Sequence, residues 1–200
     1  MAITVDALVK STSPTFQHTC SGDNSLLIVG VSYVPLNFGG ITSITYDGIN
    51  LTLYPIMVGD NLGLCVGYLI NPPVGTHDVM VTAEDFTNML CESVSFNGVK
   101  QDDAVWRIRD GVGIMVTAIP INTFARIDDV TLGIGAVNDI ESGNDGLYGN
   151  QVLVWDNSGT GLRMDGISAV GTSNYDVYPL PNKLTKPSYW ALILLGIHHA

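Results

Sequence analysis

Alternation between large apolar residues and small or polar residues recurs along most of the chain, and it limits the possible folds more than any other feature. Residues 62–70 (LGLCVGYLI) and 130–137 (VTLGIGAV) show it most clearly. A period of two places successive side chains on opposite faces of a β-strand. The alternating runs are mostly separated by Gly, Asn, Asp or Pro, which are turn residues. The chain is therefore predicted to be all-β, with little or no helix.

Two stretches are apolar on both faces, namely residues 25–34 (SLLIVGVSYV) and 189–197 (YWALILLGI). Strands covered on both faces lie inside a sheet, so we expect both in central positions. Shorter runs between them bring the total to about ten strands, at the spacing of an antiparallel β-sandwich. Residues 83–90 (AEDFTNML) are the helix-like exception and would form a single turn. No linker or repeat divides the sequence, so residues 1–200 are expected to form a single domain.

Turn-rich segments mark the expected hairpins and surface loops. In residues 45–53 (TYDGINLTL), Asp47 and Gly48 supply the positive φ angles of a tight hairpin turn. Residues 139–149 (DIESGNDGLYG) are expected to form an exposed loop. Residues 172–187 contain three prolines and no alternation, so they are expected to run over the surface before the last strand.

The charge balance excludes some classes of partner. Eight Lys and Arg residues against 19 Asp and Glu residues give a net charge of −11, which disfavours nucleic acid and anionic membrane. Charged residues make up 14% of the chain, against roughly 25% in an ordinary soluble domain, so we expect other subunits to cover apolar surface. The N-terminus lacks the pattern of a secretion signal, and the longest apolar stretch is shorter than the roughly 20 residues that cross a bilayer. Synthesis in the cytosol as a soluble protein is expected.

The three cysteines, Cys20, Cys65 and Cys91, lie in apolar or strand-like stretches without a C-x-x-C pair. Buried free thiols are the expected state. A disulfide that leaves one cysteine over is the alternative.

Several segments together resemble a family of β-sandwich proteins found in phage structural proteins and in large bacterial surface proteins. They are SGDNSLLIVGVSY, ITSITYDGINLTLY, GYLINPPVGTHDVMVTA and SVSFNGV, followed by the apolar strands DDVTLGIGAV and WALILLGI. The resemblance covers nearly the whole chain, although Gly67 stands where the family usually has Trp. It implies a jelly-roll-like antiparallel sandwich that serves as a virion or surface module. The shared motifs are structural, so the resemblance carries over no catalytic residue.

Within that family, a sequence that starts at Met1 without a secretion signal favours a phage structural gene. The absence of repetitive shaft sequence is more typical of a capsid decoration (cement) protein than of a tail fibre. Such proteins commonly sit at the threefold positions of a shell, which implies a homotrimer bound to the major capsid protein on the outer surface of the virion. The alternative is a carbohydrate- or receptor-binding module of a fibre or surface protein.

The sequence shows no motif of a common catalytic or cofactor site. It lacks G-x-S-x-G, H-E-x-x-H and G-x-x-x-x-G-K, so neither an enzyme activity nor a cofactor is predicted. One turn-rich loop offers oxygen ligands of the kind that calcium prefers, although a solvated turn has the same composition. These candidate ligands are Asp139, Glu141, Asn144 and Asp145.

Two tryptophans near expected strand ends are candidates for stacking on sugar rings or, alternatively, for the core or an interface. They are Trp106 and Trp155. The terminal pair His198 and His199 is expected to be a disordered tail, with an intersubunit hydrogen bond or a metal site as alternatives. The acid pairs at 102–103 and 128–129 are expected to be solvated turn residues.

Overall fold

A computed structural model describes most of the chain. Its described backbone comprises residues 2–118, 122–125, 129–138, 143–144, 151–159, 162–170, 176–179 and 182–200. Side chains are described for residues 2–113, 129–138, 162, 164 and 189–200. No part of this backbone is helical, and none forms a helix that is long and apolar enough to span a membrane.

The described chain contains 17 strands. In order they are β1 (Thr4–Ser11), β2 (Thr15–Cys20), β3 (Leu26–Pro35), β4 (Ile41–Tyr46), β5 (Ile49–Asn50), β6 (Thr52–Val58), β7 (Leu62–Ile70), β8 (Gly75–Ala83), β9 (Phe86–Asn97), β10 (Val105–Ala118), β11 (Asn122–Ala125), β12 (Val130–Val137), β13 (Gly143–Asn144), β14 (Gln151–Gly159), β15 (Leu162–Val170), β16 (Asp176–Pro179) and β17 (Asn182–Ile197). Four of them, β5, β11, β13 and β16, have only two to four residues, which accounts for most of the excess over the expected ten.

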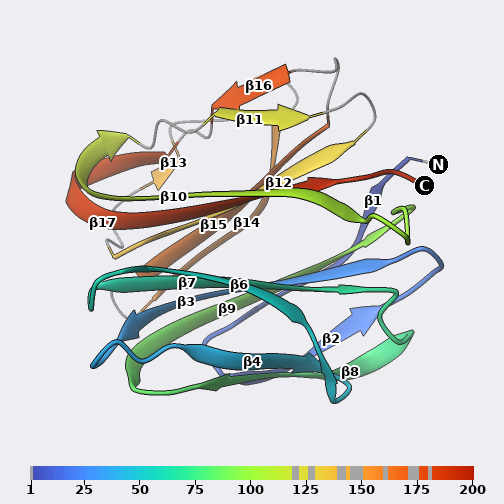
Figure 1. Cartoon of the computed structure of the whole chain (residues 1–200), viewed down its shortest axis with the longest axis horizontal. Helices are drawn as coiled ribbons and strands as arrows, with labels where there is room; N and C mark the ends of the chain where they lie inside the picture. Colours follow the sequence, from blue (N-terminus) through green and yellow to red (C-terminus); the bar gives the residue numbers. More distant parts are fainter. Residues whose placement is uncertain are drawn as a thin grey trace.

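The strands form three stacked layers (Figure 1). The middle sheet has the order β1-β9-β3-β7-β6. On one side lies the six-stranded sheet β10-β17-β12-β15-β14, in which β13 also pairs with β17, and on the other the four-stranded sheet β2-β8-β4-β5. The short pair β11 and β16 forms a separate two-stranded sheet. Every described strand pair is antiparallel, so the predicted all-β antiparallel sandwich is confirmed.

Alternation along β3 explains why there are two cores. Ile28 belongs to the cluster between the middle and six-stranded sheets, whereas its neighbour Val29 belongs to the cluster between the middle and four-stranded sheets. Successive side chains of a strand point to opposite faces, so a strand in the middle layer needs apolar residues at every position. The predicted central position of residues 25–34 is thereby confirmed. The other doubly apolar stretch lies in β17, which pairs with β10 and β12 inside its sheet.

The predicted hairpin is present between β4 and β5. Tyr46 pairs with Ile49, and the two residues between them have positive φ angles, 50° at Asp47 and 75° at Gly48. These angles match a type I′ turn, whose twist suits the flanking strands. The expectation from the Asp-Gly dipeptide is confirmed.

Two sequence predictions are wrong. Residues 83–90 are not helical, because β8 ends at Ala83 and β9 begins at Phe86, with only Glu84 and Asp85 between them. Asp85 has a φ of 45°, as expected in a tight connection. Residues 172–187 include β16 and the start of β17 rather than only a surface loop.

Candidate functional site

The C-terminal histidines form an ordered cluster around Asp129. The side chain of Asp129 is 2% exposed, and its Oδ2 lies 2.9 Å from Nδ1 of His198. Its Oδ1 lies 3.0 Å from Nδ1 of His199 and accepts the backbone N–H of that residue at 3.2 Å. An ionised carboxylate only accepts hydrogen bonds, so both Nδ1 atoms are donors. The terminal pair was expected to be disordered and Asp129 to be solvated, and both expectations are wrong.

Backbone hydrogen bonds fix the same tail. The N–H of His198 donates to the carbonyl of Ala104 at 3.0 Å, and the N–H of Lys100 donates to the carbonyl of His198 at 3.0 Å. A bridge pairs His199 with Val99. Residues 198 and 199 therefore pair with the segment between β9 and β10 and form an additional short β-ladder.

Trp106 lies on this cluster. Its ring stacks on that of His198 with centroids 5.6 Å apart and an interplanar angle of 26°. A Cβ atom on Gly196 would come within 2.7 Å of the indole, so the indole lies close against the backbone of β17. Nε2 of His198 is also 3.5 Å from Oδ2 of Asp103. The partly buried indole of Trp106 thus packs against other residues of the same chain, which agrees with the prediction of a core or interface position. This packing makes stacking of Trp106 on a sugar ring less favourable.

The other predicted site residues lie largely outside the described part. Trp155 is in β14, but its side chain is not described. Of the candidate calcium ligands, Asn144 has a described backbone, in β13, and Asp139, Glu141 and Asp145 lie outside the described residues. Among the described side chains, no group of three or more His, Cys, Asp or Glu residues is arranged to hold a metal ion.

A buried chain of hydrogen bonds runs through His18, which is 1% exposed. Oγ of Ser95 lies 3.0 Å from Nε2 of His18 and donates to Oδ2 of Asp6 at 3.0 Å. Because the single hydroxyl proton of Ser95 goes to Asp6, Nε2 of His18 must be the donor to Ser95. Nδ1 is then the acceptor for Oγ of Ser93, 2.7 Å away. The histidine is thereby held neutral in one tautomer.

The surroundings of His18 explain its protonation behaviour. Burial disfavours the charged ring and lowers its pKa to about 4, although the nearby carboxylate of Asp6 acts in the opposite direction. The carboxylate contacts Ser95 rather than the histidine, so the arrangement differs from a Ser-His-Asp triad. No local sequence pattern indicates this network, because His18 lies 77 residues from Ser95 and 75 residues from Ser93.

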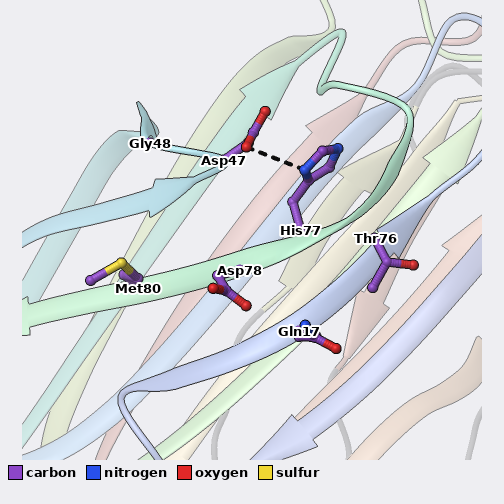
Figure 2. A pocket seen from close by; sticks show the side chains of 7 residues that line it. All are labelled: Gln17, Asp47, Gly48, Thr76, His77, Asp78 and Met80. Carbon is purple, nitrogen blue, oxygen red and sulfur yellow. Dashed lines mark ion pairs between the residues drawn. The ribbon is translucent and has the colours of Figure 1, made fainter.

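A polar pocket of about 310 Å³ opens on the four-stranded sheet (Figure 2). Nδ1 of His77 lies 3.2 Å from Oδ1 of Asp47, in the β4–β5 turn. The ring of His77 also meets that of Tyr46 edge-on, at 5.3 Å between centroids. The remaining lining residues are Gln17, Gly48, Thr76, Asp78 and Met80. Amide, hydroxyl and carboxylate groups at this density suit hydrogen bonding to a small polyhydroxylated ligand.

A second hollow, of about 280 Å³, is mainly apolar and lies between the β3–β4 loop and β6. It is lined by Tyr33, Phe38, Gly40, Ile41, Pro55, Ile56 and Met57. We call it the Phe38 groove. Phe38 is 69% exposed, and both Asn37 (φ 50°) and Phe38 (φ 60°) have left-handed backbone conformations. Such conformations are costly for residues other than glycine, so the surrounding contacts must hold the loop in place.

The three thiols are free and buried, as predicted. Burial raises the pKa of Cys65 and of Cys91 to about 12 and also raises that of Cys20. A thiol is nucleophilic only as the thiolate. None of the three is therefore suited to nucleophilic chemistry at neutral pH.

Comparison of the chain with family models, with curated proteins and with solved structures finds no match. Its function is inferred from the residues and geometry described above.

Proposed function

We propose that this chain is a non-enzymatic virion structural protein, a capsid decoration protein. In this proposal it oligomerises, as a homotrimer, and contacts the major capsid protein on the outer surface of an icosahedral phage shell. The observation that carries the proposal is the position of its exposed apolar side chains. The two described cores lie between the layers of the chain, yet large apolar residues remain exposed, most of them on edge strands and loops.

These exposed side chains belong to all three layers and to their connections. They are Val5, Leu8, Leu36, Phe38, Ile49, Met57, Val74, Met80 and Val112. Single apolar residues are normal on a protein surface, but the position of most of these residues on edge strands and loops suits contacts with other subunits. Burial stabilises such contacts by about 25 cal/mol per Å², so modest contacts repeated over many copies reinforce a shell.

The charge balance supports the same proposal. The net charge of −11 disfavours nonspecific binding to genomic DNA, which a protein assembling around a packaged genome must avoid. The layered fold also suits a structural role, because the middle sheet is covered on both faces and the outer sheets are each anchored to it.

Antibody labelling of particles tests the proposal. Particles purified from a culture of the host are labelled with antibody against the purified protein and imaged by electron microscopy. Regular label on the outside of isometric shells is the expected result. Label confined to tail fibres, or shells without label, would contradict the proposal.

The polar pocket in Figure 2 favours a second candidate function, carbohydrate or receptor binding. Gln17 and Asp78 face each other across β2 and β8 and offer both donors and acceptors to sugar hydroxyls. Glycan-array binding that is lost in Gln17→Ala and Asp78→Ala but kept in the Trp106→Ala control would support this candidate. Absence of binding to any glycan would remove it.

A further inference from the structure

Asp129 determines which ring nitrogen of His198 carries the proton. Nδ1 of His198 donates to Oδ2 of Asp129 at 2.9 Å, so in the neutral ring Nε2 has the free lone pair. Histidines that bind metal ions commonly donate their other ring N–H to a carboxylate, which fixes the tautomer and the ring orientation. The His198–Asp129 pair has this arrangement. Trp106 stacks on the same imidazole and further limits its rotation.

The lone pair on Nε2 of His198 faces a second carboxylate. Nε2 lies 3.5 Å from Oδ2 of Asp103. A charge-assisted hydrogen bond between such atoms usually measures about 2.7–2.9 Å, so this separation is too long for one. A lone pair and an ionised carboxylate that face each other repel unless a positive charge lies between them. The nearby Lys100 pairs with Asp102 instead, at 3.4 Å.

The distance between the two atoms is that of neighbouring ligands on a tetrahedral metal ion. Zinc binds histidine nitrogen at about 2.0–2.1 Å and carboxylate oxygen at about 2.0–2.2 Å. In tetrahedral geometry these bond lengths place the two ligand atoms about 3.3–3.5 Å apart, whereas octahedral geometry would place them about 3 Å apart. The 3.5 Å between His198 and Asp103 fits the tetrahedral case. A site with an imidazole ligand also suits zinc better than calcium or magnesium, which prefer oxygen ligands only.

We propose that His198 and Asp103 bind a divalent transition-metal ion of the zinc type, with Nε2 and Oδ2 as the two protein ligands. No third His, Cys, Asp or Glu among the described side chains completes the set, so water fills the other positions. Solvent reaches the site, because the side chain of Asp103 is 55% exposed and that of His198 is 13% exposed. The ion would connect the residue that follows β17 to the segment between β9 and β10. This inference goes beyond the proposed decoration role and does not depend on it.

Isothermal titration calorimetry with zinc chloride tests the site. The protein is first freed of metal with a chelator, and the wild type should then bind zinc. His198→Gln and Asp103→Asn should each weaken binding by at least about tenfold, because each removes one of two protein ligands. Circular dichroism confirms that each variant is folded, and the exposed position of Asp103 makes its variant the safer of the two. A wild type that binds no zinc, or unchanged affinity in either variant, would overturn the proposal.

Neighbouring residues provide matched controls for this titration. Asp102→Asn makes the same charge change at the adjacent position, where the side chain is 79% exposed and pairs with Lys100. His199→Gln removes a histidine that also contacts Asp129, but through the other carboxylate oxygen. Both variants should keep the wild-type affinity for zinc. Equal weakening in the controls would show that net charge or nonspecific histidine binding explains the effect, and would overturn the assignment of ligands.

Tryptophan fluorescence locates the bound ion. Cu²⁺ shares the preference for imidazole and quenches tryptophans close to it, and the Trp106 ring lies 5.6 Å from that of His198. One equivalent of Cu²⁺ should quench the wild type, and the quenching should be lost in His198→Gln and reduced in Trp106→Phe. Quenching that persists in His198→Gln would place the ion elsewhere and overturn the proposal.

Thermal unfolding measures the effect of the ion on the fold. An ion that binds the folded chain and not the unfolded chain raises the thermal midpoint. Zinc at a hundredfold excess over its dissociation constant should raise the midpoint of the wild type by roughly 5 °C, and a chelator should reverse the shift. Asp103→Asn should show little shift at the same zinc concentration. Equal shifts in the wild type and in Asp103→Asn would overturn the proposed site.

Discussion

Nδ1 of His198 lies 2.9 Å from Oδ2 of the buried Asp129 and connects the end of β17 to the residue that precedes β12. The two residues are 69 positions apart in the chain. Because His199 uses the other carboxylate oxygen, a single acidic side chain holds both terminal histidines. The strands that this contact joins, β12 and β17, are neighbours in the six-stranded sheet.

Replacement of this carboxylate should destabilise the fold. In Asp129→Asn, one oxygen acceptor becomes an NH₂ donor, so one buried histidine contact is lost. We expect a decrease of about 1–3 kcal/mol in the free energy of unfolding, measured by urea denaturation. Asp103→Asn is the control, because the Asp103 side chain is 55% exposed and 3.5 Å from His198. Equal losses in the two variants would contradict a specific role for Asp129.

Stability should decrease in acid because of His18. Its pKa of about 4 in the folded state lies below the usual value of 6.5, so the unfolded chain binds the proton more readily. The contribution of neutral His18 to the free energy of unfolding is fully present above about pH 6.5. It decreases by about 3 kcal/mol in total as the pH falls towards about 4.

Urea denaturation at several pH values measures this loss. His18→Gln should be less stable at neutral pH but should show a flatter dependence between pH 6.5 and 4. The pKa of Asp6 is lowered, despite opposing burial, by hydrogen bonds from Ser21 and Ser95, so its own contribution is lost at lower pH. A His18→Gln variant with the same slope as the wild type would contradict the assignment.

A methyl group at position 63 should not be tolerated. A Cβ on Gly63 would collide with the buried ring of Tyr33, which sits in the core of the middle and four-stranded sheets. Gly63→Ala should lower the thermal midpoint and cost at least about 1–3 kcal/mol, the usual range for overpacking. Gly30→Ala is the milder comparison, because its Cβ would lie 3.2 Å from a methyl of Ile134. Indistinguishable midpoints for the two variants would contradict this packing.

The thiols should be unreactive in the native protein. Burial raises the pKa of Cys65 and of Cys91 to about 12, so almost no thiolate is present at pH 8. Ellman's reagent should modify three thiols rapidly in denaturant and should react in buffer only as fast as the chain opens. Rapid reaction of two or more thiols in the folded protein would show that they are accessible.

The sequence pattern predicted the positions of the strands better than the pairing between strands. Alternation and turn residues located most strands, and the doubly apolar stretch in β3 revealed a sheet covered on both faces. The apolar pattern does not say which sheet covers each face of β3. The sequence therefore predicted a sandwich without the third stacked sheet. In residues 83–90, apolar residues on either side of Glu84 and Asp85 imitate helical spacing, whereas tertiary pairing makes them two strands and a turn.

The candidate site was less predictable. The sequence singles out Trp106, His198 and His199. Trp106 stacks on His198, and both histidines contact Asp129, which lies far away in sequence, so only the fold brings these residues together. No pattern in the sequence indicated the His18 network or the Phe38 groove. Both depend on register between distant strands and on loop geometry, which no local pattern encodes.

The position of β17 has a consequence for how the protein is made. This strand lies between β10 and β12, so the six-stranded sheet cannot close until β17 has left the ribosome. Until then, the apolar face of the middle sheet that contains Ile28 lacks the side chains of β17 that help to cover it. Non-local strand pairing is slow, and exposed apolar sheet surface promotes aggregation during that time. Removal of β17 should therefore yield an insoluble product rather than a smaller folded protein.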